Sequence, residues 1–289
     1  MKREARTRRI CLPAGIELHL IEQGTGEPVL LLHGGMGDCQ SWQPQLGPFS
    51  ERYRVLAYSR RHSQPNRNAI TPHSLAGDVD DLNGLLDALR IERACLVGTS
   101  YGAFVALAYA VAQPGRVIGL VLAEPPMHRW ACRTPDGAAM AARFLADVWH
   151  PAGADFASGL DRSAIERLVD GMGGRATFAS LSVERQRMAL RNARAMRLHT
   201  EAPDPFPALS RAAVARIAIP SLLVHGEHTS ALHKRVVDEL GAVMSVAEAV
   251  TIGGAGHASP LEQPQAFNAV VLPFLGRASA GRPGSRSVA

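Results

Sequence analysis

Runs of largely apolar residues recur along the chain, and segments of a different pattern separate them. Six runs are four to eight residues long, and each is followed by glycine or by a polar residue. Runs of this length are typical of strands, and those at 29–32 and 117–123 are apolar throughout, as strands buried on both faces of a sheet are. The six runs lie at 29–32, 54–59, 94–97, 117–123, 219–226 and 249–252.

The segments between these runs space their apolar residues as helices do. Residues 103–112 are almost wholly apolar and end before Pro114, as a buried helix does. Residues 9–23 instead alternate around a Pro-Ala-Gly turn, which predicts an antiparallel hairpin at a sheet edge. Strands that alternate with helices predict an α/β fold with a mostly parallel sheet. The helices are expected at 41–49, 72–89, 103–112, 231–240 and 263–275.

The stretch from 127 to 204 has no strand-like run. Helical stretches follow one another near 136–149, 160–171 and 182–199. A wholly helical insertion after one strand predicts a cap over the carboxyl ends of the strands, where parallel sheets hold their ligands. The expected organisation is a core at 1–126 and 205–276, a helical cap at 127–204 and a flexible basic tail at 277–289.

Composition and charge narrow the class of protein. The 289 residues are 46% hydrophobic and 20% charged, which fits one large globular domain with an inserted lid. The net charge of +5 comes from the ends, since residues 1–9 contribute +4 and 277–289 contribute +3 and the rest carries −2. We therefore expect no nucleic-acid partner.

No membrane partner is expected either, because no apolar run approaches the roughly 20 residues of a membrane span. The basic start lacks the apolar region of a signal peptide, and the four cysteines show neither ligand nor disulfide spacing. These features favour a cytoplasmic protein with reduced thiols. The oligomeric state stays open between monomer and homodimer.

The sequence Gly98-Thr99-Ser100-Tyr101-Gly102 joins a predicted strand to a predicted helix. In this context G-x-S-x-G is a tight turn that needs its glycines and holds the serine on strained backbone above the sheet. A serine hydroxyl becomes a nucleophile only when a base removes its proton and a carboxylate orients that base. Ser100 is therefore the candidate nucleophile.

Two further parts of such a site are predicted from chain order. His257 is the candidate base, because it lies in a glycine-rich loop between the last predicted strand and the closing helix. The oxyanion that forms on serine attack needs hydrogen-bond donors already in place. The expected donors are the backbone N–H groups of Tyr101, directly after Ser100, and of Gly35, in the loop after the first buried strand.

Three motifs in this order resemble the α/β-hydrolase fold superfamily along nearly the whole chain. They are LLLHGGMG at 30–37, GTSYGAFVALAYA at 98–110 and GGAGHASPLEQP at 253–264. The resemblance implies a doubly wound, mostly parallel sheet with a helical cap after strand 6. It also implies Ser100 as nucleophile, His257 as base, and Gly35 with Tyr101 as the oxyanion hole.

The acid departs from the usual pattern of this superfamily. Its members usually carry an aspartate in a G-x-x-D pattern after strand 7, where this chain has Gly226-Glu227-His228-Thr229. A minority places the acid after strand 6, and Glu124 stands at that point. We therefore predict Glu124 as the triad acid, with Glu227 as the alternative.

These features predict a serine hydrolase that cleaves a small-molecule carboxylic ester or lactone through an acyl-enzyme on Ser100. Hydrolysis of a carbon–carbon bond, a cofactor-free cyclisation, and ligand binding without catalysis are the alternatives. Haloalkane dehalogenases and epoxide hydrolases of this fold use aspartate at the nucleophile position. No metal-ligand cluster or dinucleotide motif is present in the sequence, so neither metal nor cofactor is expected.

An apolar substrate pocket is expected above the serine turn. Its candidate residues are long apolar side chains from the oxyanion loop and the predicted cap, although packing of the cap onto the core is an equal alternative for each. They are Met36, Trp130, Phe144, Trp149 and Met188.

Overall fold

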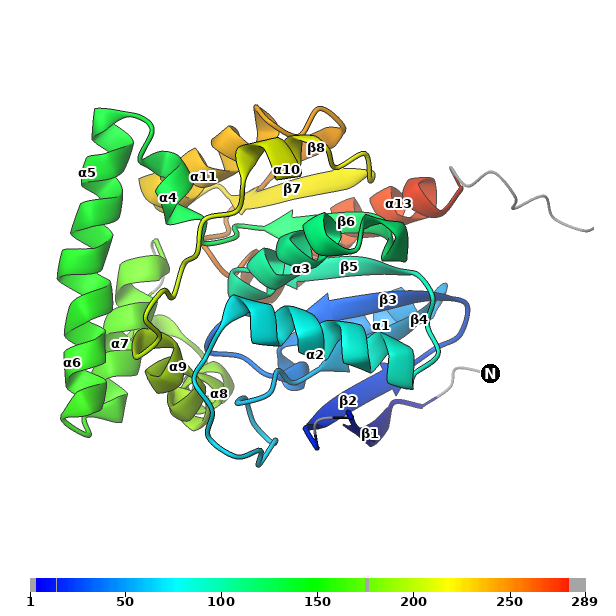
Figure 1. Cartoon of the computed structure of the whole chain (residues 1–289), viewed down its shortest axis with the longest axis horizontal. Helices are drawn as coiled ribbons and strands as arrows, with labels where there is room; N and C mark the ends of the chain where they lie inside the picture. The colour runs from blue at the N-terminus through cyan, green and yellow to red at the C-terminus, as the bar shows by residue number, and fades with distance from the viewer. Residues whose placement is uncertain (1–3, 14, 175–176, 281–289) are drawn as a thin grey trace, which may run out of the picture.

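The computed structural model describes residues 4–13, 15–174 and 177–280, and an eight-stranded sheet runs through them (Figure 1). The strands are β1 (Arg6–Cys11), β2 (Glu17–Gln23), β3 (Glu27–Leu32), β4 (Tyr53–Tyr58), β5 (Ala94–Thr99), β6 (Val117–Ala123), β7 (Ser221–Gly226) and β8 (Ala247–Ile252). Their order in the sheet is β1-β2-β4-β3-β5-β6-β7-β8. Strand β2 runs antiparallel to β1 and β4, and the other neighbours are parallel. The predicted α/β-hydrolase fold class is confirmed.

Both faces of the central strands are covered. In β3, Leu30 and Leu32 belong to one buried apolar cluster, whereas Val29 and Leu31 belong to the other. All four side chains are fully buried. A strand with helices on both faces has to be apolar at every position, which is why the central strands form continuous apolar runs in the sequence.

Helices form the outer layers of the core. Helices α2 (Leu75–Ala88), α3 (Tyr101–Ala112) and α11 (Ala231–Gly241) pack on one face of the sheet. Helices α1 (Gln43–Ser50) and α13 (Pro264–Ala280) pack on the other face. Short 3₁₀ turns precede α1 at Cys39–Trp42 and β6 at Pro114–Arg116.

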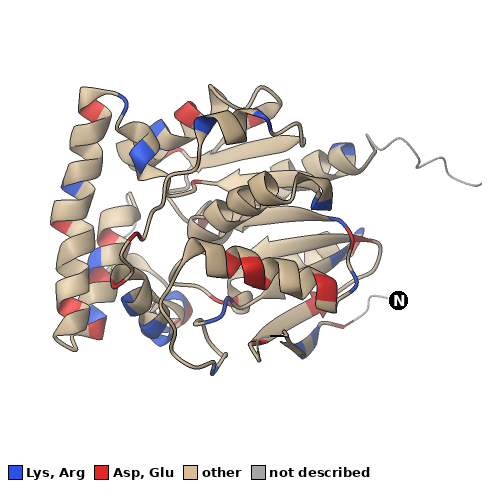
Figure 2. Cartoon of the chain, in the orientation of Figure 1, with Lys and Arg blue, Asp and Glu red and all other residues tan. Residues whose placement is uncertain are grey.

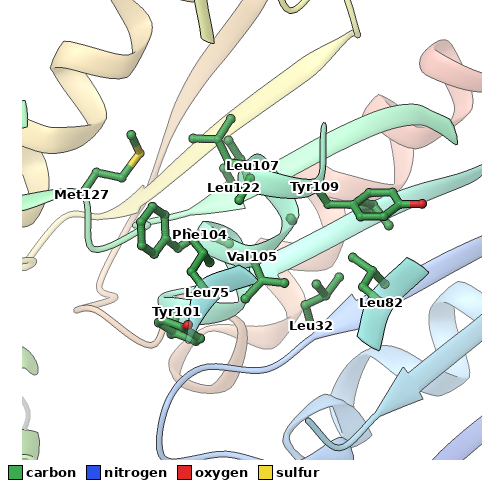
Figure 3. Packing of buried hydrophobic residues seen from close by; sticks show 14 of the residues in the cluster. Leu32, Leu75, Leu82, Tyr101, Phe104, Val105, Leu107, Tyr109, Leu122 and Met127 are labelled. Atoms are coloured by element: carbon green, nitrogen blue, oxygen red, sulfur yellow. The ribbon is translucent and has the colours of Figure 1, made fainter. Parts of the chain in front are cut away.

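Helix α3 is the most deeply buried of these helices, since every residue from Tyr101 to Ala110 is buried. Figure 3 shows Val105 and Leu107 of α3 in one cluster with Leu32 of β3 and Leu122 of β6. Contact with both strands fixes the start of α3 over the sheet, and the turn before it is fixed with it.

The helical cap lies between β6 and β7 in the chain and beside the carboxyl ends of the parallel strands in space (Figure 1). Its longest helix is continuous from Pro135 to Ala157, and Leu145–Trp149 forms a π-helical turn within it. Such turns are often found at functional sites. The cap elements are α4 (His128–Ala131), α5 (Pro135–Phe144), α6 (His150–Ala157), α7 (Asp161–Met172), a 3₁₀ turn (Phe178–Ser180), α8 (Val183–Arg191) and α9 (Ala193–Thr200). Two further short helices, α10 (Arg211–Ala215) and α12 (Ser259–Glu262), belong to the core.

The chain ends differ from the sequence-based expectation. Strand β1 begins at Arg6, and Arg8 donates a hydrogen bond of 2.6 Å to Glu22 across the hairpin. At the other end α13 includes Arg277, because Ala278 is buried and packs near the backbone of Gly119 in β6. The predicted flexible tail from 277 therefore begins as helix, and its remainder from 281 lies outside the described residues.

Basic and acidic residues are both distributed along the described chain (Figure 2). Helix α2 carries four aspartates, and basic residues elsewhere pair with acids, as Arg54 of β4 does with Glu22 of β2 and Arg211 of α10 does with Glu239 of α11. Among the described residues, none of the helices combines the length and the apolar character that crossing a membrane requires.

Candidate active site

Ser100 lies at the turn between β5 and α3, on backbone that disfavours an ordinary side chain. Its φ is 51° and its ψ is −124°, outside the main allowed regions for residues other than glycine. The N–H of Ser100 donates to the carbonyl of Ala123 in β6 (2.7 Å), which fixes the turn against the neighbouring strand. Strain of this kind persists only where the surroundings determine it.

The two glycines of the turn are required by close backbone contacts. A Cβ on Gly102 would lie 2.1 Å from the carbonyl oxygen of Leu32, and one on Gly98 would lie 2.6 Å from the backbone nitrogen of Ala103. Neither backbone atom can move without displacing β3 or α3. The glycine spacing of the motif is thus a consequence of how tightly α3 packs on the sheet.

Ser100, His257 and Glu124 form a continuous hydrogen-bond chain. The Nε2 atom of His257 lies 3.0 Å from Ser100 Oγ, and its Nδ1 atom lies 2.7 Å from Glu124 Oε2. Because the carboxylate can only accept, Nδ1 carries the proton and Nε2 is left to accept one from the serine. This is the relation that a nucleophile, a base and an orienting acid require.

Glu124 occupies a fully buried position at the end of β6, with a φ of 49°. Its Oε1 accepts the backbone N–H of Gly226 (2.8 Å), and its Oε2 accepts the hydroxyl of Thr229 (2.6 Å) beside the bond to His257. A buried carboxylate needs such donors. The structure therefore brings the acid predicted after strand 6 to the histidine, from the strand next to β7.

The alternative acid, Glu227, lies elsewhere. Its side chain is 55% exposed and accepts the backbone N–H of Gly254 at 2.8 Å. Thr229, at the position where the superfamily usually has aspartate, instead donates to Glu124. The structure thus joins Glu124, and not Glu227, to His257.

The loop of His257 is held by Glu262, which was not predicted. The two carboxylate oxygens of Glu262 accept the backbone N–H groups of Gly256 (2.5 Å) and Ala258 (3.2 Å) on either side of the histidine. The position of the imidazole over Ser100 is therefore fixed by its own loop as well as by Glu124. The only signal in the sequence is the short spacing of five residues between His257 and Glu262.

The loop after β3 carries Gly35, and the side chain of His33 fixes this loop. His33 Nε2 accepts the N–H of Arg60 (3.0 Å), so the proton lies on Nδ1, which donates to the carbonyl of Gly34 (2.7 Å). Burial lowers the pKa of His33 to about 3 and keeps the ring neutral. Gly35 and Tyr101 both line the pocket, and Tyr101, as the first residue of α3, has an N–H without an acceptor in its own helix.

A cavity of about 150 Å³ lies over Ser100 between the core and the cap. A cavity of this volume holds a ligand about as large as benzene, and flexible methionines in its wall allow some expansion. Its lining is mainly apolar, and the Arg185 and Glu262 side chains that border it stand 3.8 Å apart. Large apolar side chains in the lining are Trp149, Met172, Leu181, Met188, Met196 and Phe206.

The predicted pocket residues divide into two groups. Met36, Trp149 and Met188 line the cavity. Trp130 lies outside the lining, because its Nε1 donates to the carbonyl of Leu209 (3.0 Å) and the guanidinium of Arg211 covers its ring. Phe144 also lies outside it, packed behind Trp149 at 6.3 Å between ring centroids.

Two buried histidines near the triad were missed by the sequence analysis. The ring of His233, on α11, stacks on His257 with centroids 4.2 Å apart, and His128 lies 5.7 Å beyond His233. Burial lowers the pKa of His128 to about 3 and that of His233 well below its ordinary value, so both rings are neutral. The available signal was their place in the chain, shortly after the carboxyl ends of β6 and β7.

Glu124, His233 and His257 form a group whose ligating atoms lie within 4.8 Å of one another, as in a metal site. Two imidazoles and a carboxylate would suit zinc. The geometry does not fit, because the two rings are stacked 4.2 Å apart at an interplanar angle of 18°, so their nitrogen lone pairs lie in nearly parallel planes and do not converge on one ion. We assign Glu124 and His257 to the hydrogen-bond chain of Ser100, with His233 stacked on His257, and assign none of the three to a metal.

The sheet order, the cap and the strained serine turn together define the α/β-hydrolase class. A profile of the alpha/beta hydrolase family matches residues 29–270, most of the chain, and the protein belongs to this family. A curated relative, 2-hydroxymuconate semialdehyde hydrolase of Pseudomonas sp. (strain CF600), is 29% identical over 297 residues, covering 94% of this chain and 95% of the relative.

Solved structures resemble the fold over its whole extent. The enol-lactonase from Burkholderia xenovorans LB400 superposes with a TM-score of 0.75 at 22% identity and covers 93% of this chain and 100% of its own. The carboxylesterase CesB from Bacillus subtilis superposes with a TM-score of 0.74 at 21% identity and covers 94% of this chain and 92% of its own. At these identities the likeness concerns the fold.

Proposed function

We propose that the protein hydrolyses a small carboxylic ester or lactone through an acyl-enzyme on Ser100. The observation that carries the proposal is the hydrogen-bond chain from Ser100 through His257 to the buried Glu124. At Ser100 this hydrogen-bond chain reaches an apolar cavity whose lining includes Gly35 and Tyr101. These are the parts that acyl transfer requires.

The proposed reaction has two steps, formation of the acyl-enzyme and its hydrolysis. Ser100 Oγ attacks the carbonyl carbon while its proton passes to His257 Nε2, and the imidazolium is stabilised through Nδ1 by Glu124. In this proposal the negative oxygen of the tetrahedral intermediate accepts hydrogen bonds from the N–H groups of Gly35 and Tyr101. His257 then returns the proton to the leaving alkoxide, and a water activated by the same histidine releases the carboxylic acid from Ser100.

The cavity favours a small apolar substrate. Its volume of about 150 Å³ suits a short acyl chain or a small lactone ring better than a long fatty acyl chain. The enol-lactonase and carboxylesterase structures share the fold with this chain and are named for these two substrate classes.

A fluorophosphonate probe tests the proposed nucleophile. We expect covalent labelling of Ser100, seen as a mass increase on the tryptic peptide that contains it, and no labelling of Ser100→Ala. Short methyl esters should be hydrolysed by the wild type and not by Ser100→Ala. Failure of the folded wild type to react with the probe would exclude the acyl-enzyme.

The relative that matches over nearly its whole length supports a second candidate function. 2-Hydroxymuconate semialdehyde has no ester bond, so its hydrolysis breaks a carbon–carbon bond. A substrate with a carboxylate could bind Arg185, whose pKa is lowered by burial and whose acidic partner Glu262 stands 3.8 Å away. Turnover of 2-hydroxymuconate semialdehyde, followed by loss of its absorbance and compared with methyl hexanoate, separates the two candidates.

A further inference from the structure

His128, the first residue of α4, lines the cavity although neither ring nitrogen has a hydrogen-bond partner among the described residues. The residue is only 4% exposed, so bulk water does not solvate the ring. Phe144 and Phe206 enclose it, with ring centroids at 4.6 and 4.8 Å. A polar ring between aromatic side chains thus borders the pocket with its hydrogen-bonding capacity unused.

This arrangement is costly in the ligand-free protein. A neutral imidazole has one N–H donor and one acceptor nitrogen, and leaving a buried donor or acceptor unmatched costs about 1–3 kcal/mol. A phenylalanine would occupy a similar volume between the same two rings without this cost. A polar group of a ligand that enters the cavity and bonds the ring would remove this free-energy cost. The site therefore favours ligands that carry such a group.

The surroundings of His128 determine the charge of such a ligand. Three side chains face the ring, namely Phe144 of α5, His233 of α11 and Phe206, which precedes α10. None of them supplies an anion. Burial, together with the nearby His257, lowers the pKa of His128 to about 3. Since His257 itself gains a proton in the proposed reaction, a second cation beside it is disfavoured throughout, and the ring stays neutral.

We propose that His128 forms a polar subsite that binds an uncharged oxygen of the substrate, a ketone or a hydroxyl group, beside Ser100. The inference rests on the proposed ester or lactone hydrolysis and narrows the substrate to one that carries a second oxygen function. A neutral imidazole donates to a ketone, and it both donates to and accepts from a hydroxyl. A carboxylate would favour an imidazolium that this site disfavours.

Within the described part of the chain, His233, the ring next to His128, adds a further unpaired nitrogen to the proposed subsite. Its Nδ1 lies 3.0 Å from Ser230 Oγ, and this oxygen already accepts the backbone N–H of His233 (3.2 Å). The hydroxyl of Ser230 can donate to Nδ1 or accept from it, and in either role it provides the partner of this nitrogen. Nε2 is buried without a partner among the described residues, on the ring next to His128. One oxygen, from substrate or water, between the two rings would serve both.

Matched esters test the subsite. Methyl hexanoate is compared with its analogues that carry a ketone at carbon 3, 4 or 5, and released acid is titrated for the wild type, His128→Phe and His128→Gln. We expect the kcat/KM of the wild type to be about tenfold higher for at least one keto ester than for methyl hexanoate, as one net hydrogen bond allows. The difference should come from a lower KM. The preference should disappear in His128→Phe and persist in part in His128→Gln, which keeps a donor and an acceptor.

Two kinds of result would contradict a ligand-binding role of His128. A purely structural role for His128 would lower the rates for all four esters together and leave their ratios unchanged. The proposal also fails if the wild type shows no preference for any keto ester, or if the preference survives in His128→Phe. Unfolding in urea, measured in parallel, shows whether each variant is folded.

A binding measurement separates this proposal from the reaction itself. Calorimetric titration of Ser100→Ala with 2-heptanone should show affinity about tenfold higher than for Ser100→Ala/His128→Phe. Equal affinities would refute the subsite even if esters are hydrolysed. Wild type that neither reacts with fluorophosphonate nor hydrolyses esters would refute the proposed function, while the ketone titration would still decide the subsite.

Discussion

Thr229 and Glu124 come from neighbouring strands and meet at one point. The hydroxyl of Thr229 lies 2.6 Å from Glu124 Oε2, and the same oxygen lies 2.7 Å from His257 Nδ1. A carboxylate of suitable length at either position would therefore reach the histidine. The glutamate, longer than aspartate by one methylene, spans the distance from β6, and Thr229 is one of its hydrogen-bond donors.

Glu124→Ala should lower kcat by about 10³–10⁴-fold, on the scale of losing a triad carboxylate, because His257 loses the acceptor that fixes its tautomer. Adding Thr229→Asp should restore part of the rate, since a carboxylate then stands again within reach of Nδ1. The measurement is ester hydrolysis at saturating substrate, with circular dichroism to confirm folding.

The matched control is Glu227→Ala, which removes an exposed carboxylate two residues before Thr229. We expect a rate within a few-fold of the wild type, because its side chain bonds Gly254 and not His257. A large loss in Glu227→Ala together with a normal rate in Glu124→Ala would reverse the assignment of the acid.

At the residue scale, the sequence predicted those side chains whose position follows from a local motif. Ser100 and His257 lie in glycine-rich turns at strand ends, and Glu124 was found because Thr229 cannot carry charge. His128 and His233 could not be found in this way. Their importance depends on unmatched nitrogens, and only the packing of α4 and α11 against the triad determines which nitrogens lack a partner.

At the element scale, the contact between α3 and β3 depends on the absence of one side chain. Alanine is favoured over glycine in a helix by about 1 kcal/mol. At Gly102, however, the added Cβ would lie 2.1 Å from the carbonyl oxygen of Leu32, which is backbone and cannot turn away. Steric repulsion therefore outweighs helix propensity at this position.

Gly102→Ala should lower the free energy of unfolding by several kcal/mol and displace Ser100, which precedes it by two residues. The control is Gly153→Ala in α6, where the new Cβ would make an ordinary contact of 3.6 Å with Thr200. That variant should be unchanged or more stable by about 0.5–1 kcal/mol. Urea midpoints for the two variants give the comparison, and equal midpoints would contradict the close packing of α3 on β3.

The order of strands and helices was predictable because apolar periodicity is a local signal. Continuous runs identified β3 to β8, and the gap in strand-like runs identified the cap. The pocket wall was less predictable, because Trp130, Phe144 and Trp149 are equivalent in the sequence pattern. Only the packing of the cap decides that Trp149 reaches the cavity while Trp130 bonds Leu209.

At the scale of the whole molecule, buried neutral histidines are expected to make stability depend on pH. Burial lowers the pKa of His33, His73 and His128 to about 3, and lowers those of His199 and His233 well below 6.5. In the unfolded chain these groups titrate near 6.5. Below that pH the unfolded state binds protons that the folded state does not, so their contribution is complete above pH 6.5 and is lost as the pH falls towards 3.

Asp38 acts in the same direction at lower pH. Burial alone would raise its pKa, but hydrogen bonds from Arg191 and Asn192 of the cap outweigh this and hold the pKa below 3.8. Its contribution is present at neutral pH and is lost as the pH falls through that range. Because Asp38 belongs to the core, acid weakens the attachment of the cap.

We expect the urea midpoint to fall steeply between pH 7.5 and pH 5.0. Each proton taken up on unfolding changes the free energy of unfolding by about 1.4 kcal/mol per pH unit. His128→Phe should reduce the slope by about one proton and raise stability at pH 5.0 relative to the wild type. Denaturation curves at four pH values provide the slopes, and a flat profile would show that these histidines ionise in the folded protein.

Only Pro125, Pro126 and Met127 separate Glu124 from His128 along the chain. The residue that orients the base and the residue proposed to select the ligand are therefore joined by a short, stiff link, and the cap side of the pocket wall follows it in the chain. Exchange of the segment from Met127 to the start of β7 between family members would replace the cap side of the pocket and retain Ser100, Glu124 and His257. The proline pair is thus a suitable junction for chimaeric proteins. Substrate recognition can change on its C-terminal side while the three hydrogen-bonded residues of the reaction are kept.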